Sequence, residues 1–206
     1  MNYLFDHPEK VLGLFGEHLY ITAISLGIAL IIAIPLGLLV VKFSKLYVPV
    51  TGFLGLVYTI PSLALFAILI PITGLGSTTA IVGLIAYSQM ILVRNVVAAI
   101  RGIDPLMLEA ARAMGMNKWQ MILKIEIPLA LPVVVAGIRI AAVSIISIAT
   151  VAAWINAGGL GTLIFEGIYR SHSEKIIAGT VTIALLAIAA DLLFRLIEKW
   201  LRPNIV

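Results

Sequence analysis

The sequence predicts an all-α integral membrane protein with five transmembrane helices, and three observations lead to this prediction. Of the 206 residues, 62% are hydrophobic and only 12% are charged, which is too little charge to cover a globule in water. The apolar residues gather in stretches long enough to cross a bilayer, for which about 20 residues are needed. Lys and Arg residues are concentrated in alternate loops between those stretches.

The five predicted spans follow one another along the chain. A Pro/Gly/Ser cluster at 71–77 separates the second span from the third and is typical of a tight turn. The segment 156–175, between the fourth and fifth spans, is glycine-rich and mildly polar, and we expect it to be a short re-entrant or interfacial segment. The spans cover approximately residues 19–41, 48–70, 78–93, 131–155 and 176–195, and together they form a single transmembrane domain over 1–206.

Loop charges predict the orientation. The loops on the side of the C-terminus hold ten Lys and Arg residues, and the loops on the opposite side hold three. Because basic residues accumulate in cytoplasmic loops, we expect the N-terminus outside the cell membrane and the C-terminus in the cytoplasm. This asymmetry explains the formal charge of +4 without a nucleic-acid partner. His7, His18 and His172 all fall in predicted outer loops.

Several catalytic signatures are missing from the sequence. There is no GxxxxGK[ST] phosphate loop, so the chain is not expected to bind ATP by itself. With zero cysteines and no HExxH motif, we expect no metal site. Ser144 and Ser147 lie in the fourth predicted span, but no base is within reach by sequence. We therefore do not expect an enzyme.

Two of the spans carry patterns that predict helix contacts. Ser25, Ala29, Ala33 and Gly37 recur every four residues, which predicts a thin stripe where another helix approaches closely. Arg139 in the fourth span is close enough to the cytoplasmic interface to extend its side chain toward it. In the fifth span and its tail, we predict i,i+4 ion pairs between Asp191 and Arg195 and between Glu198 and Arg202.

The stretch 94–128 is the predicted cytoplasmic loop, and it begins with a short helix. Asp104 is a good N-cap residue, and Pro105 suits the first helical position. Gly115 is a natural C-terminal stop in a left-handed conformation. The spacing therefore predicts a helix from Pro105 to just before Gly115.

A second short helix is predicted directly afterwards. Asn117 and Gln120 have the spacing of a capping box, and the helix is expected to run to about 127 and to end before Pro128. Two interpretations of this helix pair remain open from the residues alone. It is either an ordinary amphipathic pair at the membrane surface or a docking element for a partner.

The same stretch resembles the EAA…G…I.LP signature of permease subunits in ABC importers. EAARAMG at 109–115 is followed by IEIP at 125–128, with Ile127 where leucine is usual. In that family this unit is the coupling helix, which sits in a groove of the cytoplasmic ATPase. The resemblance implies a set of ATPase-coupling residues, namely Glu109, Ala110, Ala111, Gly115, Ile125 and Pro128.

Three further stretches resemble the osmoprotectant (glycine betaine/carnitine/choline) uptake permeases. They are TIPSLAL at 59–65, AGIR at 136–139 and AGGLG at 157–161. Asn156 departs from the pattern, since these families commonly have glycine there. Methionine-uptake permeases share the last glycine run and the five-span core but usually lack the TIPSLAL stretch.

Aromatic and helix-breaking residues are the candidates for a translocation path. Pro61 removes a backbone hydrogen bond in mid-span and predicts a kink or break, and broken helices often line substrate paths. Aromatic rings bind quaternary ammonium ions through cation–π contacts, although packing kinks and aromatic belts are alternative explanations. The candidate set is Tyr58, Pro61, Ser62, Tyr87, Trp154 and Asn156.

The resemblance implies that the chain is the permease subunit of an ATP-driven ABC importer that moves glycine betaine, carnitine or choline into the cell. The implied partners are the lipid bilayer, a cytoplasmic ATPase dimer that binds ATP and Mg²⁺, a second permease copy or paralogous permease, and an extracellular or periplasmic solute-binding protein. The chain itself is expected to hold no cofactor. The alternatives are a permease for methionine or another betaine-like solute, and a membrane scaffold without transport activity.

Overall fold

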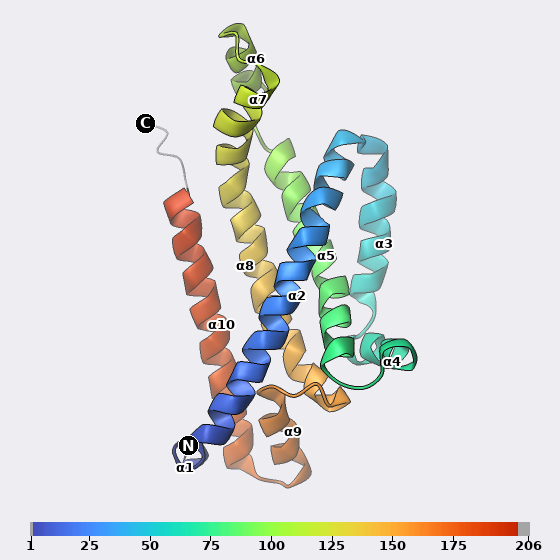
Figure 1. Cartoon of the computed structure of the whole chain (residues 1–206), viewed down its shortest axis with the longest axis vertical. Helices are drawn as coiled ribbons and strands as arrows, with labels where there is room; N and C mark the ends of the chain where they lie inside the picture. Colours follow the sequence, from blue (N-terminus) through green and yellow to red (C-terminus); the bar gives the residue numbers. More distant parts are fainter. Residues whose placement is uncertain (1, 202–206) are drawn as a thin grey trace.

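The computed structural model describes residues 2–201, which form an elongated helical bundle (Figure 1). Four long helices, α2, α5, α8 and α10, run roughly along its long axis. The helices are α1 (Asn2–Asp6), α2 (Pro8–Lys42), α3 (Tyr47–Thr59), α4 (Ser62–Thr73), α5 (Ser77–Arg101), α6 (Pro105–Ala113), α7 (Lys118–Met121), α8 (Ile127–Ala152), α9 (Gly161–Tyr169) and α10 (Ser173–Leu201), with 3-10 turns at Ser44–Leu46 and Ala153–Ile155 and a π-helical turn at Ile122–Glu126.

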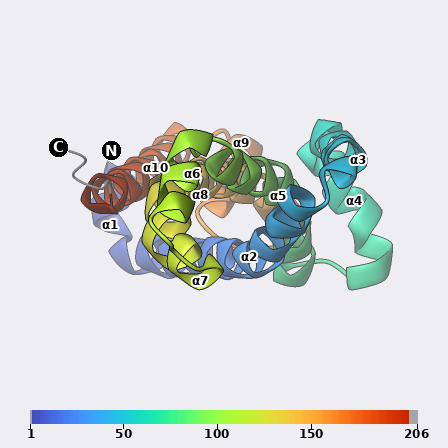
Figure 2. The same cartoon turned by 90° about the horizontal axis from the view of Figure 1, so that it is seen from above.

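Within residues 2–201, four helices are long and apolar enough to cross a membrane, and a bent pair of helices makes a fifth candidate. The four are α2, α5, α10 and the continuous helical column Lys118–Ile155 that contains α8. The bent pair is Ser44–Thr59 with α4. In the view along the long axis, α3 and α4 lie on one flank of the bundle and α10 lies on the other (Figure 2). The predicted all-α membrane fold is confirmed.

Most helices extend past the predicted limits of the spans. α2 begins at Pro8 rather than near 19, α5 ends at Arg101 rather than near 93, and α10 reaches Leu201. Hydropathy marks only the part of a helix that suits hydrocarbon, whereas helical hydrogen bonding continues into the polar ends. As a consequence His18 lies inside α2 with 1% of its surface exposed, and the prediction that it falls in an outer loop is wrong.

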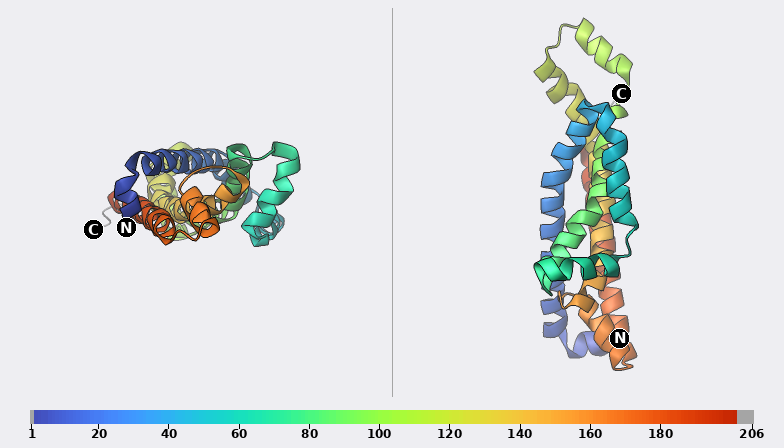
Figure 3. Two further views of the ribbon diagram at one scale, coloured as in Figure 1. Left: turned by 90° about the horizontal axis from the view of Figure 1, so that it is seen from below. Right: turned by 90° about the vertical axis from the view of Figure 1, so that its right-hand side faces the viewer.

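The second predicted span, 48–70, is not one continuous helix. α3 and α4 meet at 97°, and α4 lies across the long axis (Figure 3, right). Ile60 and Pro61 between them have extended backbone, with ψ of 128° and 137°. Proline lacks an N–H donor and keeps the preceding residue out of the helical region. Pro61 therefore breaks the helix, as the sequence predicts.

The predicted stop before Pro128 is wrong, because the helix that begins at Lys118 continues directly into α8. The intervening turn, Ile122–Glu126, is π-helical, and the N–H of Ile127 donates to the carbonyl of Ile122. Pro128 follows this wider turn and lies in the first turn of α8, and the helix continues past it. The predicted loop 94–128 is correspondingly shorter, since its ends extend α5 and the α8 column.

The small-residue stripe of α2 is a packing surface, as predicted. Ser25, Ala29 and Ala33 are fully buried, and the stripe faces α5. A Cβ atom on Gly37 would lie only 2.6 Å from Cγ1 of Val96 on α5. α2 and α5 therefore approach so closely that position 37 has no room for a side chain.

Candidate coupling and translocation sites

The α6–α7 unit projects from one end of the bundle (Figures 1 and 3). The Asp104 side chain accepts a hydrogen bond from the N–H of Leu106 at 2.9 Å, so it caps α6 as predicted. Gly115 has a φ of +80°, the left-handed conformation expected of a helix stop. Asn117 and Gln120 each accept from the other's backbone N–H, at 2.9 and 2.8 Å, which confirms the capping box.

The motif residues divide between the tip of this unit and its base. Glu109 and Ala110 are exposed on α6, whereas Ala111 is 1% exposed. Ile125 and Pro128 are half-buried farther along the column, in the π-helical turn and the first turn of α8. Exposed apolar clusters mark interaction surfaces. The tip, formed by α6 and α7, exposes four large apolar side chains, namely Leu106, Met107, Met114 and Trp119.

Four of the predicted path residues meet at the break in the second span. The rings of Tyr58 and Tyr87 lie 5.8 Å apart at 72°, an edge-to-face arrangement. The Tyr87 hydroxyl donates to the carbonyl oxygen of Ile60, a group that the break deprives of a helical partner. Pro61 and Ser62 follow directly. The tyrosine pair therefore sits against the exposed backbone of a broken helix.

Trp154 and Asn156 have other neighbours. Trp154 is 55% exposed, and its indole N–H donates to the hydroxyl of Tyr169 at 3.1 Å. Asn156 has a φ of +64°, and asparagine is one of the few residues other than glycine that adopt this conformation readily. This conformation explains why asparagine can replace the glycine that is common here in the families that the sequence resembles.

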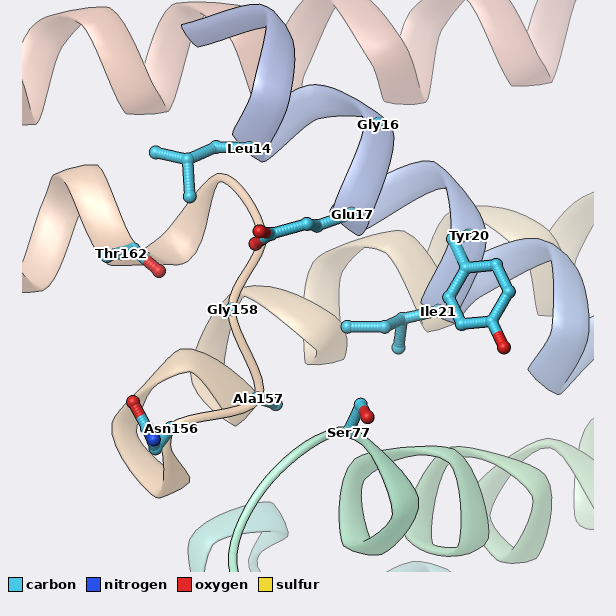
Figure 4. A pocket seen from close by; sticks show the side chains of 10 residues that line it. All are labelled: Leu14, Gly16, Glu17, Tyr20, Ile21, Ser77, Asn156, Ala157, Gly158 and Thr162. Atoms are coloured by element: carbon cyan, nitrogen blue, oxygen red, sulfur yellow. The ribbon is translucent and has the colours of Figure 1, made fainter. Parts of the chain in front are cut away.

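Asn156 borders a hollow of about 680 Å³ at the end of the bundle where α1 and α9 lie. Figure 4 shows its walls, which come from α2, the start of α5, α9 and the loop after α8. Glu17 and Tyr20 line it from α2, and Ser77 lines it from α5. The N–H of Gly76 donates to the carbonyl of Ile155 at 3.0 Å, so the two loops at this end are joined directly.

Arg139 on α8 pairs with two carboxylates on α10, whereas the sequence predicts only that its side chain extends toward the cytoplasmic interface. Its guanidinium donates to Asp191 on α10 at 3.0 Å and lies 3.6 Å from the Glu198 carboxylate. Asp191 also pairs with Arg195 at 2.9 Å, as predicted. The predicted partner of Glu198, Arg202, lies outside the described residues. Opposite charges in the fourth and fifth spans were the available signal, because charges at membrane depth usually pair.

A second ion-pair cluster, missed by sequence reasoning, joins three helices at the opposite end. The Glu166 carboxylate on α9 accepts from Lys175 on α10 at 2.8 Å and from Lys10 on α2 at 2.9 Å. Hydrogen bonds first from Lys175 and then from Lys10 lower the pKa of Glu166 below its usual value. The ammonium of Lys175 also lies 5.3 Å from the centre of the Tyr3 ring.

Comparison with known proteins shows the family of this chain. Residues 25–203 match the family described as binding-protein-dependent transport system inner membrane component. The glycine betaine/carnitine/choline transport system permease protein OpuCB of Bacillus subtilis (strain 168) is 39% identical over 99% of this chain and 94% of its own length. The osmoprotectant import permease protein OsmW of Salmonella typhimurium (strain LT2) is 40% identical over 99% of this chain and 97% of its own length.

A solved structure supports the fold. A chain of the MetNI methionine ABC transporter, in its inward-facing form, superposes with a TM-score of 0.84 over 94% of this chain and 97% of the other. At 24% identity this similarity speaks for the fold alone. The resemblance indicated by the EAA-type motif is confirmed, and the chain is a permease subunit rather than an enzyme. The chain belongs to the binding-protein-dependent transport system inner membrane components, the multi-pass permeases that work in a complex with an ATPase.

Proposed function

We propose that this permease moves a quaternary ammonium osmoprotectant, namely glycine betaine, carnitine or choline, into the cell. The observation that carries the proposal is the similarity of nearly the whole chain to permeases of that substrate class, at 39% and 40% identity. The TIPSLAL stretch, which contains the helix break, lies within the matched region. The three solutes share a trimethylammonium group, so one path can serve all of them.

The translocation path in this proposal runs past the break between α3 and α4. A trimethylammonium ion has no hydrogen-bond donor and is recognised by the faces of aromatic rings and by negative potential. Tyr58 is 43% exposed beside Tyr87, and the carbonyl of Ile60 adds partial negative charge. Trp154 and Asn156 contribute nearer the hollow at the end of the bundle. Each of these contacts is weak, as suits a path that must release its solute.

The coupling residues in this proposal are Glu109, Ala110, Ala111 and Gly115 at the tip, with Ile125 and Pro128 at its base. An exposed apolar tip that includes Trp119, 74% exposed, suits a groove on a partner protein. We infer that this partner is a cytoplasmic ATPase dimer, which binds ATP and Mg²⁺. Because α7 and α8 form one helical column, movement of the tip reaches the spans without a flexible joint.

The domain in this proposal crosses the membrane five times, with the bent pair α3–α4 as the second crossing. The α6–α7 end faces the cytoplasm, and the end with α1 and α9 faces outward. A second permease, either a copy of this chain or a paralogue, completes the path between them. A solute-binding protein delivers the solute to the outer end, where the hollow beside Asn156 forms part of the outer gate.

The test is uptake by the assembled transporter. The permease, its ATPase and its binding protein are reconstituted in proteoliposomes with ATP inside, and uptake of labelled glycine betaine, carnitine, choline and methionine is measured. We expect ATP-dependent uptake of at least one quaternary amine and no uptake of methionine. Uptake of methionine alone would establish the second candidate, a methionine permease, whose family shares the glycine run at 157–161. The scaffold alternative is not retained, since the chain belongs to a transport family.

A further inference from the structure

Glu17 makes a contact that neither the path nor the coupling unit uses. It lies on α2 and reaches the loop of residues 156–160, which we call the outer loop. The N–H of Gly159 donates to Oε2 of Glu17 at 2.9 Å. Figure 4 shows the carboxylate extending from α2 toward this loop at the edge of the hollow. One exposed carboxylate therefore joins α2 to the backbone that borders the hollow.

The backbone of the outer loop fits closely around two consecutive side chains of α2. A Cβ atom on Gly158 would lie 2.4 Å from Oε2 of Glu17, and one on Gly159 would lie 3.0 Å from Nδ1 of His18. Both glycines have positive φ, 82° and 78°, which side chains disfavour. The loop is therefore shaped to receive Glu17 and His18.

His18 forms the fixed part of this arrangement. It is 1% exposed, and its Nε2 lies 3.1 Å from the carbonyl oxygen of Ile146 on α8. Because a carbonyl oxygen only accepts hydrogen bonds, Nε2 carries the hydrogen and donates it. His18 thus fixes α2 to α8 in a place that water does not reach.

Glu17 forms the releasable part. Glu17 as a whole is exposed, and its hydrogen bond from the N–H of Gly159 is part-buried, so water replaces this bond at low net cost once the loop moves. We propose that Glu17 is a positioning residue of the outer gate. Its contact with Gly159 holds the outer loop at the edge of the hollow in the resting permease, and release of the contact lets the loop move away from α2 while His18 remains fixed. The proposal rests on the proposed function, in which this end receives the solute.

A cysteine reporter tests the contact directly. The chain contains no cysteine, and Ala157, which lines the hollow, is 8% exposed. In the assembled transporter carrying Ala157→Cys, labelling by a membrane-impermeant maleimide measures how often the outer loop opens. We expect Glu17→Ala to speed labelling roughly three- to tenfold, as the loss of one hydrogen bond predicts. Glu17→Gln keeps an acceptor oxygen and should label more slowly than Glu17→Ala.

Two controls separate this role from general effects of charge and folding. Glu9→Ala removes the same charge from the same helix, where Glu9 is exposed, and should leave the Ala157→Cys rate unchanged. Glu9→Cys is a freely accessible reference and should label at the same rate whether position 17 is Glu, Ala or Gln. If Glu9→Ala speeds the Ala157→Cys reporter as much as Glu17→Ala does, the effect is one of general charge and the proposal fails.

A double-mutant cycle tests the pairing of Glu17 with the outer loop. Gly158→Ala should displace the carboxylate and also strain the backbone, whereas in the Glu17→Ala background only the strain remains. The two effects on labelling should therefore be less than additive. Full additivity, or equal labelling rates in wild type and Glu17→Ala, would overturn the proposal. Because labelling needs no solute, failure of quaternary amine uptake with the expected labelling rates would reject the proposed substrate and leave the role of Glu17 standing.

Discussion

The backbone N–H of Met116 donates to the carbonyl oxygen of Ala111 at 3.1 Å, and this hydrogen bond caps the C-terminus of α6. A second bond runs from the N–H of Gly115 to the carbonyl of Arg112 at 2.9 Å. Together they form a Schellman motif, which requires a left-handed residue at Gly115. A Cβ atom there would meet no atom within 4 Å. The corner between α6 and α7 therefore depends on the backbone angle of Gly115 rather than on space around it.

The first prediction follows from this corner. Gly115→Val should raise the free energy of the left-handed backbone conformation at this position by about 1 kcal/mol or more. The substitution should therefore change the angle between α6 and α7 and move α7 out of the orientation in which the tip contacts the ATPase. We expect membrane insertion to be normal and both ATPase co-purification and solute-stimulated ATP hydrolysis to fall. Gly115→Asn is the matched control, because asparagine tolerates this conformation, and should retain most coupling. Equal coupling by both variants would contradict the prediction.

The second prediction concerns charge at the coupling tip. Glu109 is exposed on α6, so Glu109→Lys should leave the fold and membrane insertion intact. The variant would present a positive charge to the partner at the site where Glu109 presents a negative one. Transport and solute-stimulated ATP hydrolysis should therefore fall together. Glu109→Gln, which removes the charge without reversing it, should lie between wild type and Glu109→Lys. Wild-type transport by Glu109→Lys would remove Glu109 from the coupling site.

The third prediction concerns orientation. Single cysteines at Ser44 and Asn117 should be shielded from an impermeant reagent in intact cells, because both lie toward the α6–α7 end. Cysteines at Ser77 and Ser171 should be labelled from outside. Labelling of all four positions after cell lysis is the control for reactivity. External labelling at position 117 in intact cells would reverse the proposed topology.

The fourth prediction concerns the close approach of α2 and α5. Gly37→Leu should destabilise the protein by about 1–3 kcal/mol, because its side chain would overlap Val96 in a packed interface. Gly27→Leu on the same helix is the control, since a Cβ there would meet nothing within 4 Å. The melting temperature in detergent should fall for Gly37→Leu and change little for Gly27→Leu. Equal melting temperatures would show that the two helices separate at low cost.

The fifth prediction concerns pH. Because the pKa of Glu166 is lower in the folded protein than its ordinary value of 4.5, its pairs with Lys10 and Lys175 stabilise fully above that value. The stabilisation is lost as pH falls through the lower, folded pKa. The melting temperature should therefore decrease on acidification below about pH 4.5 in wild type. Glu166→Gln should start lower and lose less, and an identical decrease in both proteins would exclude Glu166 as the source.

Short-range features of this fold could be predicted from the sequence. The apolar stretches indicated the membrane helices, Pro61 indicated the break in the second span, and the caps at Asp104 and Asn117 indicated where α6 and α7 begin. Hydropathy and capping involve residues within one or two helical turns, so the local sequence is sufficient for them. The error at Pro128 arose because the π-helical turn, which lets the helix continue, is a hydrogen-bond shift that composition does not encode.

The contacts between helices were decided only by the tertiary structure. Arg139 pairs with Asp191, Tyr87 reaches the carbonyl of Ile60, and Glu17 reaches Gly159. Each contact joins residues that are distant along the chain, and each depends on how one helix is rotated and displaced against another. The sequence by itself determined which segments are helices in a membrane. The way those helices pack against one another decided which of their polar groups meet, and this packing brings together residues that no local pattern connects.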